Sequence, residues 1–581
     1  MPVAAAVRKK ESHTKSTEQT KVGSIEKMLS SPFAPLAVTG LFLLILVTWT
    51  CVDSSLPVHD AAWHSTYSNS VKQWLSRPRG WSWQTLNAIL CMQPNYPAAV
   101  WFFNGFCKLF VGDSIWAERM ILALHLCILN ASSWLLANAV WKDRMKATLT
   151  LIFLDCCPLI LALQHVSFID LPHTAFFAAY LCSLAYWWND TTWKRTALTA
   201  VLFGLDCASK QIAVLYAVPV LAVLGVILLL KRQFKPILQL LAIGLTGAAF
   251  LLTWVIPNFT ELTQYTHHRS NLGATRFGFV AGVMRNAQVS ASLIVQSFSP
   301  LMAAVLAALL FVRKKDGIKQ LWLPLAATTI GIVLLLTVAF WNIPESRYFG
   351  PVMITLSMLL ACQMANAYRS DNKKGGALLL VTITLCLVQT GLLCFQKRPV
   401  VTHPVVIGLS PVFKYLGISD SMLVNELPYY PKGDPWKQEW MFRFIEEIEG
   451  RGRPVYLNVL ANSPEFNQGT LACMARMRKP CVFPTTWRCS MPDVSDSFTC
   501  TDKELHFMQW VALKTGPQYC RWFDERSSNN YEEVVGKLQK TDGLFIEAAR
   551  QPLPDGTELV LYQNKFWMFN KNALPAAGGA H

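Results

Sequence analysis

Long apolar runs separated by short basic loops fill the chain from about residue 36 to residue 395. Many of these runs are long enough to carry a helix across about 30 Å of hydrocarbon. The pattern predicts about eleven membrane spans, at 36–52, 120–141, 147–163, 171–188, 196–208, 212–230, 237–256, 292–312, 321–340, 348–367 and 377–395. The chain is therefore predicted to be a multi-span membrane protein whose first span is a start-transfer helix rather than a cleaved signal peptide.

The run 97–111 decides the predicted topology, because it is apolar but short and contains Lys108. If it lies at the outer surface as a juxtamembrane helix, the basic clusters of the short loops all share the side of the basic N-terminus, as the insertion bias requires. If it crossed, they would all lie outside. We therefore predict a cytoplasmic N-terminus. The outer segments are then 53–119, 164–170, 257–291, 341–347 and everything after 396.

Polarity rises after residue 396, where the pattern becomes that of a soluble α/β domain. Strands are predicted at 455–460 and 544–547 and helices at 465–477 and 532–538. A closing hairpin is predicted from the runs 558–562 and 566–569. The predicted organisation is a disordered basic tail over 1–31, a helical membrane domain over 32–395 with a large outer loop over 53–119, and an extracytoplasmic α/β domain over 396–581.

Charge and motifs narrow the function. The net charge of +16 could indicate nucleic-acid binding, but the basic residues lie in short clusters between apolar runs, where orientation during insertion explains them. We therefore predict a membrane-lipid environment and no nucleic-acid partner. The chain has no Walker loop, no GxGxxG after a strand, no HExxH and no GxSxG, so nothing indicates a nucleotide-driven pump or a membrane hydrolase.

Asp60 is the first candidate for chemistry. It lies in the sequence PVHDAAWH just outside the first span, with His59, Trp63 and His64 around it. A carboxylate at the mouth of a helical bundle is where a lipid-carried substrate could meet a general base. The alternative is that Asp60 caps the interfacial helix predicted over 64–74, because Asp is among the best N-cap residues.

Three further candidates lie at the same predicted surface. Asp170 opens the span 171–188 and is either a second carboxylate of the cavity or a helix cap. Lys210 stands in an otherwise apolar segment and either snorkels to the boundary or binds a phosphate. Arg347 opens another span, where a cation is unfavourable to the helix dipole and implies an anionic partner, either Glu345 or a ligand phosphate.

The order of these motifs resembles the GT-C glycosyltransferases of the protein O-mannosyltransferase type, including the bacterial lipid A aminoarabinose transferase. The matching segments are PVHDAAWH, QPNYPAAVWFFNGFCKLFVGDSIWAERM, SFIDLPHTAFF, GLDCASKQIAVLYAVP and ESRYFGP, over residues 36–395. The resemblance implies a polyprenyl-phosphate sugar donor, a hydroxyl acceptor at the outer face, and inversion at the anomeric carbon. It leaves open whether the acceptor is a lipid, a glycan or a protein.

The resemblance also implies roles for the candidates. Asp60 would be the general base or the acceptor-orienting carboxylate, and Asp170 the second acidic residue of the cavity. Lys210 and Arg347 would contact the lipid phosphate, and Tyr348 would shape that site.

The chain departs from the family pattern at one position. Several relatives have Lys or His before the first proline of the proline-tyrosine motif, whereas this chain has Gln93. That phosphate contact is therefore either neutral or supplied elsewhere, by Arg269 or Arg276. The expected cavity lining consists of His59, Trp63, His64, Gln93 and Tyr96.

Two questions stay open at this stage. The adjacent His267 and His268 could bind a divalent metal ion, although adjacent histidines rarely make a closed site. A transporter or flippase of lipid-linked saccharides would also use basic residues, but transporters place their polar sites near the midplane and often show repeated halves. Eleven spans are more than an anchor for the C-terminal domain needs. A glycosyltransferase is the leading hypothesis. The resemblance to the bacterial branch favours the bacterial inner membrane, and a location in the endoplasmic reticulum would share the same topology.

Overall fold

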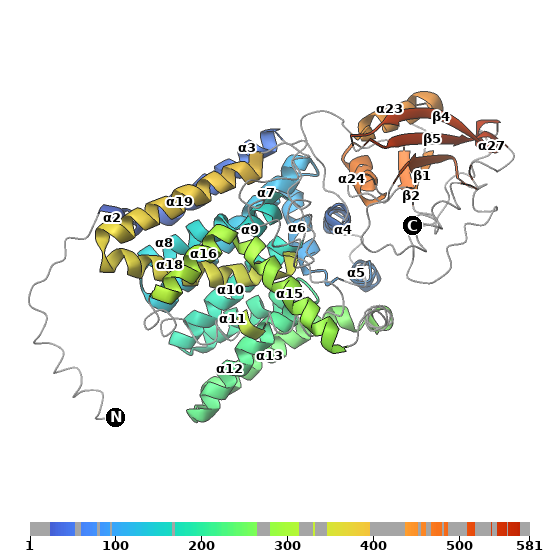
Figure 1. Cartoon of the computed structure of the whole chain (residues 1–581). Helices are drawn as coiled ribbons and strands as arrows, with labels where there is room; N and C mark the ends of the chain where they lie inside the picture. Colours follow the sequence, from blue (N-terminus) through green and yellow to red (C-terminus); the bar gives the residue numbers. More distant parts are fainter. Residues whose placement is uncertain are drawn as a thin grey trace, which may run out of the picture.

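The computed structural model of the chain shows a bundle of helices followed by a small mixed sheet (Figure 1). The described residues are 24–52, 60–77, 82–92, 96–165, 169–263, 279–312, 329–331, 346–395, 436–450, 455–460, 466, 468–478, 482–485, 508–516, 536, 538, 543–554 and 556–569. Most of the predicted N-terminal tail and of the predicted helix 532–538 lies outside them.

The bundle confirms a polytopic helical membrane protein. Among the described residues, six helices are long and apolar enough to cross a membrane, or eight spans if each of two bent pairs counts as one. The predicted number of about eleven spans stays a prediction. The helices are α2 (Ser24–Leu29), α3 (Ala34–Val52), α4 (Asp60–Leu75), α5 (Trp83–Leu90), α6 (Ala99–Val111), α7 (Ile115–Trp141), α8 (Arg144–Asp155), α9 (Pro158–His165), α10 (Asp170–Asn189), α11 (Trp193–Cys207), α12 (Ala213–Leu230), α13 (Phe234–Val255), α15 (Phe279–Phe298), α16 (Pro300–Val312), the 3-10 helix η3 (Ser346–Phe349), α18 (Gly350–Ser370) and α19 (Asn372–Phe395).

Two spans predicted as continuous helices are broken. The run 147–163 forms α8 and α9, which are bent by 62° where Pro158 begins the second helix. The run 292–312 is interrupted between α15 and α16 at Ser299, which has a positive φ of 92° and precedes Pro300. A proline has no N–H to donate and its ring clashes with the carbonyl of the preceding turn, so both helices restart at the proline.

Helix α10 forms the centre of the bundle, with sixteen buried residues among its twenty. It packs most extensively against α7 and α11 and also contacts α18. At the periphery, α19 turns apolar side chains outward, for example Leu380, which is 63% exposed, and Val388, which is 52% exposed. An apolar outer surface around a tightly packed interior is what a lipid environment allows.

The C-terminal part is a mixed five-stranded sheet, in the order β2-β1-β3-β5-β4. Strand β1 is parallel to both β2 and β3, whereas β5 is antiparallel to β3 and β4. Helix α24 connects the parallel strands β1 and β2, as a parallel crossover requires. The elements are α23 (Gln438–Glu449), β1 (Val455–Leu460), α24 (Gln468–Arg478), β2 (Val482–Thr485), β3 (Trp510–Lys514), β4 (Phe545–Pro552), β5 (Glu558–Asn564) and α27 (Lys565–Phe569).

The predicted closing hairpin is wrong in its location. Strand β5 pairs with the preceding strand β4, and residues 565–569 form helix α27 instead of a second strand. The turn lies between β4 and β5, where Leu553 donates its N–H to the carbonyl of Thr557 at 2.8 Å and Gly556 has a φ of 79°. The Asp-Gly sequence at 555–556 is a stronger hairpin signal than the residues between the runs 558–562 and 566–569, where the turn was predicted.

Helix α4 connects the two parts of the molecule. It lies against α6 of the bundle and also contacts α24 of the C-terminal part (Figure 1). The contact with α6 is close at Gly105, where an added Cβ would lie 2.7 Å from the carbonyl oxygen of Ser68 and 2.8 Å from the Cβ of Val71. Any side chain at this position must therefore separate the two helices.

We expect the Gly105→Ala variant to melt several degrees below the wild type, because the new methyl group overpacks the α4–α6 contact at a cost of about 1–3 kcal/mol. Gly40→Ala in α3 is the control, since nothing lies within 4 Å of an added Cβ there. Alanine is the better helix former, so the control should melt at or above the wild-type temperature. Tryptophan fluorescence of the purified protein in detergent measures both. Equal melting temperatures for the two variants would contradict the close contact.

Candidate functional site

The structure describes some of the predicted site residues and not others. Asp170, Lys210, Arg347, Tyr348, Trp63, His64 and Tyr96 are described. Asp60 is the first residue of α4, but its side chain is outside the description. Outside the described residues altogether lie His59, Gln93, Arg269 and Arg276, as well as Glu345, His267 and His268.

Asp170 and Lys210 form a buried ion pair. Asp170 is the first residue of α10, and Lys210 lies in the turn after α11; their side chains are 1% and 3% exposed. Lys210 therefore does not snorkel to a polar boundary. Asp170 is not the N-cap of its helix either, because Ile169 occupies that position without a side-chain capping bond. The structure shows a packed ion pair, an arrangement that was not among the alternatives considered from the sequence.

The ion pair is completed by the segment that contains Arg347 and Tyr348. The Lys210 ammonium lies 4.4 Å from the centre of the Tyr348 ring, in a cation–π contact. Tyr216 of α12 donates its hydroxyl to the carbonyl of Tyr348 at 2.9 Å and so fixes η3 at this position. The Arg347 guanidinium is 5.8 Å from the same ring and is only partly buried. Asp170, Lys210, Arg347 and Tyr348 thus share one region.

A second polar group lies beside the first. His173 Nδ1 lies 3.0 Å from Ser209 Oγ and 3.1 Å from Asp206 Oδ1, and Ser209 donates to the Asp206 carbonyl at 2.6 Å. The His173 ring stacks on Tyr216 with 5.3 Å between the ring centres. Sequence reasoning missed this group.

The spacing of the two pairs could have indicated this group. His173 follows Asp170 by three residues on one helix, and Asp206 precedes Lys210 by four. Residues three apart share a helix face, so Asp170 and His173 lie on one side of α10, whereas Asp206 lies at the end of α11 and Lys210 in the turn that follows it. Ionisable residues within membrane helices are candidates for function by default.

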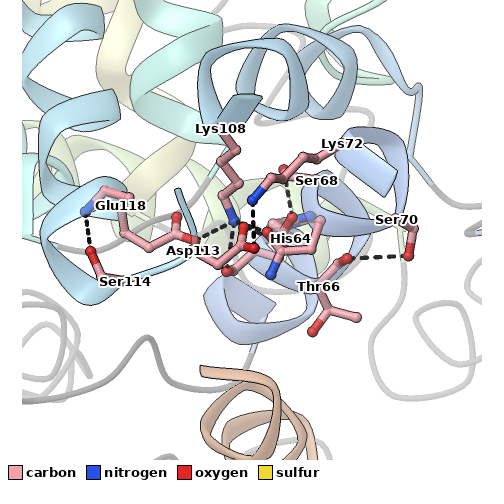
Figure 2. A network of polar contacts seen from close by, with 12 residues as sticks. His64, Thr66, Ser68, Ser70, Lys72, Lys108, Asp113, Ser114 and Glu118 are labelled. Carbon is pink, nitrogen blue, oxygen red and sulfur yellow. Dashed lines mark hydrogen bonds and ion pairs between the residues drawn. The ribbon is translucent and has the colours of Figure 1, made fainter. Parts of the chain in front are cut away.

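Lys108 holds α4 in place. Its side chain is fully buried, and its ammonium donates to Asn69 Oδ1 at 2.7 Å and to the Ser65 carbonyl at 3.1 Å, both on α4. It also pairs with Glu118 of α7, which in turn accepts a hydrogen bond from the Ser65 hydroxyl. Figure 2 shows the Lys108 side chain extending from α6 into this network. Three helices are therefore joined at one buried charge.

The aromatic residues of the expected lining pack around His64. Trp101 donates its indole N–H to His64 Nδ1 at 3.2 Å, and Tyr96 lies edge-on to the His64 ring at a centre distance of 5.1 Å. Trp63 stacks instead on Tyr67 of the same helix, with 6.1 Å between the ring centres.

The α4 region and the ion pair belong to one packed body. The backbone N–H of Ala99, at the start of α6, donates to the carbonyl of Ala208 at 3.1 Å, two residues before Lys210. Tyr96 packs in a cluster with Val100 and Ile169, and Ile169 directly precedes Asp170. The helix that begins at Asp60 is thus connected to the Asp170–Lys210 pair through the first turn of α6.

Within the described ranges, no three His, Cys, Asp or Glu side chains lie close enough together to hold a metal ion. His267 and His268 lie outside these ranges, so the binding of a divalent metal ion stays a prediction.

Comparisons with known proteins bear on the fold. Residues 93–260 match the model of the family described as dolichyl-phosphate-mannose-protein mannosyltransferase. The structure is similar to that of ArnT from Cupriavidus metallidurans bound to undecaprenyl phosphate, with 14% identity, a TM-score of 0.51, and coverage of 90% of this chain and 97% of that chain. The apo structure of the same ArnT gives a TM-score of 0.52 at the same identity and coverage. The chain has an ArnT-like fold.

The resemblance inferred from the order of the motifs is confirmed by these two kinds of similarity. The family match spans 93–260, which includes Gln93, Asp170 and Lys210 but neither Asp60 nor Arg347. A comparison with curated proteins gives no match. The ArnT-like fold is therefore supported by the family match and the structural similarity. The grouping of the individual site residues is supported by their geometry alone.

We expect Lys108→Met to destabilise the protein by about 3–5 kcal/mol, because it leaves Glu118 buried without its cation. Lys72→Met is the matched control on α4: the Lys72–Asp113 pair spans 2.6 Å, but its side chains are 22% and 43% exposed. Exposed pairs contribute only about 0–1 kcal/mol. Thermal unfolding in detergent should therefore show a large loss for the first variant and a small one for the second. Equal losses would show that Lys108 is not the anchor of α4.

Proposed function

We propose that the protein is an integral membrane glycosyltransferase that moves a sugar from a polyprenyl-phosphate donor to a hydroxyl acceptor, with inversion. The observation that carries this proposal is the convergence of Lys210, Arg347 and Tyr348 with the Asp170 carboxylate where α10 begins. Supporting it are the description of the family that matches residues 93–260 and the undecaprenyl phosphate named for the ArnT structure. The acceptor is a lipid, a glycan or a protein.

The two cations suit the departing phosphate. When the bond between the sugar and the phosphate breaks, negative charge develops on the phosphate oxygens, and preorganised cations in a water-poor site stabilise it. Arg347 is partly exposed and would meet the phosphate first, whereas Lys210 is buried behind Tyr348. Asp170 balances the Lys210 charge and fixes the direction of the Lys210 ammonium, which makes Asp170 a positioning residue in this proposal.

Asp60 is proposed as the general base. The acceptor oxygen would attack the anomeric carbon from the face opposite the phosphate, the carbon–phosphate oxygen bond would break, and the acceptor proton would pass to the carboxylate. Asp60 begins α4, the helix that Lys108, Asn69 and Glu118 hold in a fixed position. A fixed position matters, because displacing a catalytic group by about 1 Å can cost about 100-fold in rate.

The proposed orientation follows the charge of the short loops. The N-terminus would be cytoplasmic, and α4, the ion pair and the domain over 396–581 would lie on the extracytoplasmic side of a bacterial inner membrane. An acceptor at that surface would reach Asp60 from the side of the C-terminal domain, since α24 contacts α4.

Asp60→Asn should lower sugar transfer by about 100-fold or more, because general-base catalysis typically contributes about 10²–10⁴-fold. Binding of undecaprenyl phosphate should be unchanged. Asp113→Asn is the control, since this carboxylate also lies beside α4 but is exposed and paired with Lys72. The measurement is transfer from a polyprenyl-phosphate sugar by the purified proteins in lipid nanodiscs. Full activity of Asp60→Asn would remove the assignment of Asp60 as the base.

Arg347→Ala should weaken binding of undecaprenyl phosphate about tenfold or more, since a hydrogen bond to a charged group contributes about 1.5–3 kcal/mol. Arg77→Ala is the control, because Arg77 is an exposed cation at the end of the α4 segment. Titration of both variants with undecaprenyl phosphate, followed by intrinsic fluorescence, measures the two dissociation constants. An unchanged constant for Arg347→Ala would show that Arg347 serves only contacts within the protein.

A further inference from the structure

A cavity of about 600 Å³ opens at the end of the bundle away from α4. Its walls include Ser30, Trp141, Lys142, Arg144 and Arg369. Helix α7 runs from the Lys108 network to this cavity, so the two lie about 36 Å apart at 1.5 Å per helical residue. Figure 1 shows α2 at one end of the bundle and α4 and α5 at the other. The proposed donor site does not use this cavity.

One wall of the cavity is a closed ionic group. Arg369 donates to Asp143 at 2.6 and 3.2 Å and to Glu26 at 2.9 and 2.7 Å. Burial raises the pKa of Asp143. The hydrogen bond from Arg369 and its positive charge outweigh that effect and hold the pKa of Asp143 below its usual value. Asp143 is therefore an anion at neutral pH, and Arg369 is already neutralised by two carboxylates.

The two remaining cations are exposed toward the cavity. Lys142 and Arg144 flank Asp143 in the sequence and both line the cavity. In the part of the chain that the structure describes, neither side chain has a hydrogen-bonding or ion-pair partner. Lys142 ends α7 in the left-handed region, with a φ of 52°, and so turns the chain at the cavity. The charge of Arg369 is matched by the carboxylates of Asp143 and Glu26. The charges of Lys142 and Arg144 therefore make the cavity electropositive.

We propose that this cavity binds a phosphate-bearing anion, presented by a membrane lipid or free in solution. A lysine ammonium and an arginine fork on either side of one turn supply the donors that a phosphate needs, and uncharged donors from Ser30 and Asn138 stand in the same wall. The volume lies within the range of ligand pockets, about 300–1,000 Å³. The N-terminus of α8 adds nothing here, because Asp143 already caps it.

The surroundings of the cavity favour the lipid as the source. Ser30 lies between two exposed apolar side chains, Met28 at 63% and Phe33 at 73%, which would border acyl chains. Trp141 in the wall is the residue type that collects at membrane interfaces. An anionic headgroup held by Lys142 and Arg144 would thus have its apolar tail against the start of α3.

The test compares two double variants with the same loss of charge. Lys142→Gln with Arg144→Gln removes the cavity cations, and Lys231→Gln with Arg232→Gln removes two exposed cations between α12 and α13 that do not line the cavity. Delipidated protein in detergent is titrated with phosphatidylglycerol, and bound lipid is counted by native mass spectrometry. The cavity variant should bind about 25-fold more weakly, at about fivefold per basic residue. The control variant should bind within about twofold of wild type, because its two residues lie outside the cavity.

Two further arms decide the interpretation. Lys142→Arg with Arg144→Lys keeps the charge and should retain binding, which separates charge from folding. Inorganic phosphate added in competition distinguishes the sources: displacement of the lipid identifies the phosphate itself as the ligand, and failure to displace it identifies a lipid that also needs its acyl chains. Equal binding by wild type and the cavity variant, or equal weakening in the cavity and control variants, would overturn the proposal.

Discussion

The buried ion pair between Asp170 and Lys210 is the interaction on which the arrangement of the site depends. Both charges are taken out of water, so each is tolerable only while the other is in place. This requirement fixes the start of α10 against the turn after α11, and the Lys210 ammonium then holds the Tyr348 ring. Arg347 follows, because it is the neighbour of Tyr348 in the short helix η3. One charge pair therefore brings three distant segments together.

The same physical rule operates a second time where α4 packs against α6. Lys108 is buried on an apolar helix, so each N–H of its ammonium needs an acceptor within the protein. Asn69, Ser65 and Glu118 supply these acceptors. These polar contacts add to the apolar packing of Val71 and Tyr67 of α4 against Trp101 of α6. The bond from Ala99 to Ala208 then transmits the position of α6 to the segment that ends at Lys210. The candidate base and the candidate phosphate site are thus parts of one rigid arrangement.

The hydrophobic pattern predicted the elements that depend on local sequence. It did not predict the features that depend on contacts between distant segments. The strand 455–460 and the helix 99–111 were predictable, because an apolar run bounded by polar residues forms its element without help. The breaks at Pro158 and Ser299 lie inside apolar runs, and the hydrophobicity of a run does not change where a proline interrupts its helix. The partners of Lys108 could not be predicted, since nothing in the spacing of residues 65, 69 and 118 relates them to it.

The two ends of α7 show how one bundle can present different electrostatics at its two faces. At the Glu118 end the buried Lys108 ammonium is matched inside the protein by the Glu118 carboxylate. At the Lys142 end the cations face a cavity and exceed the carboxylates. Loop cations of this kind are usually assigned only to orientation during insertion. A cavity between them gives the same residues a second use, because a cation that has oriented a helix remains available to hold an anion.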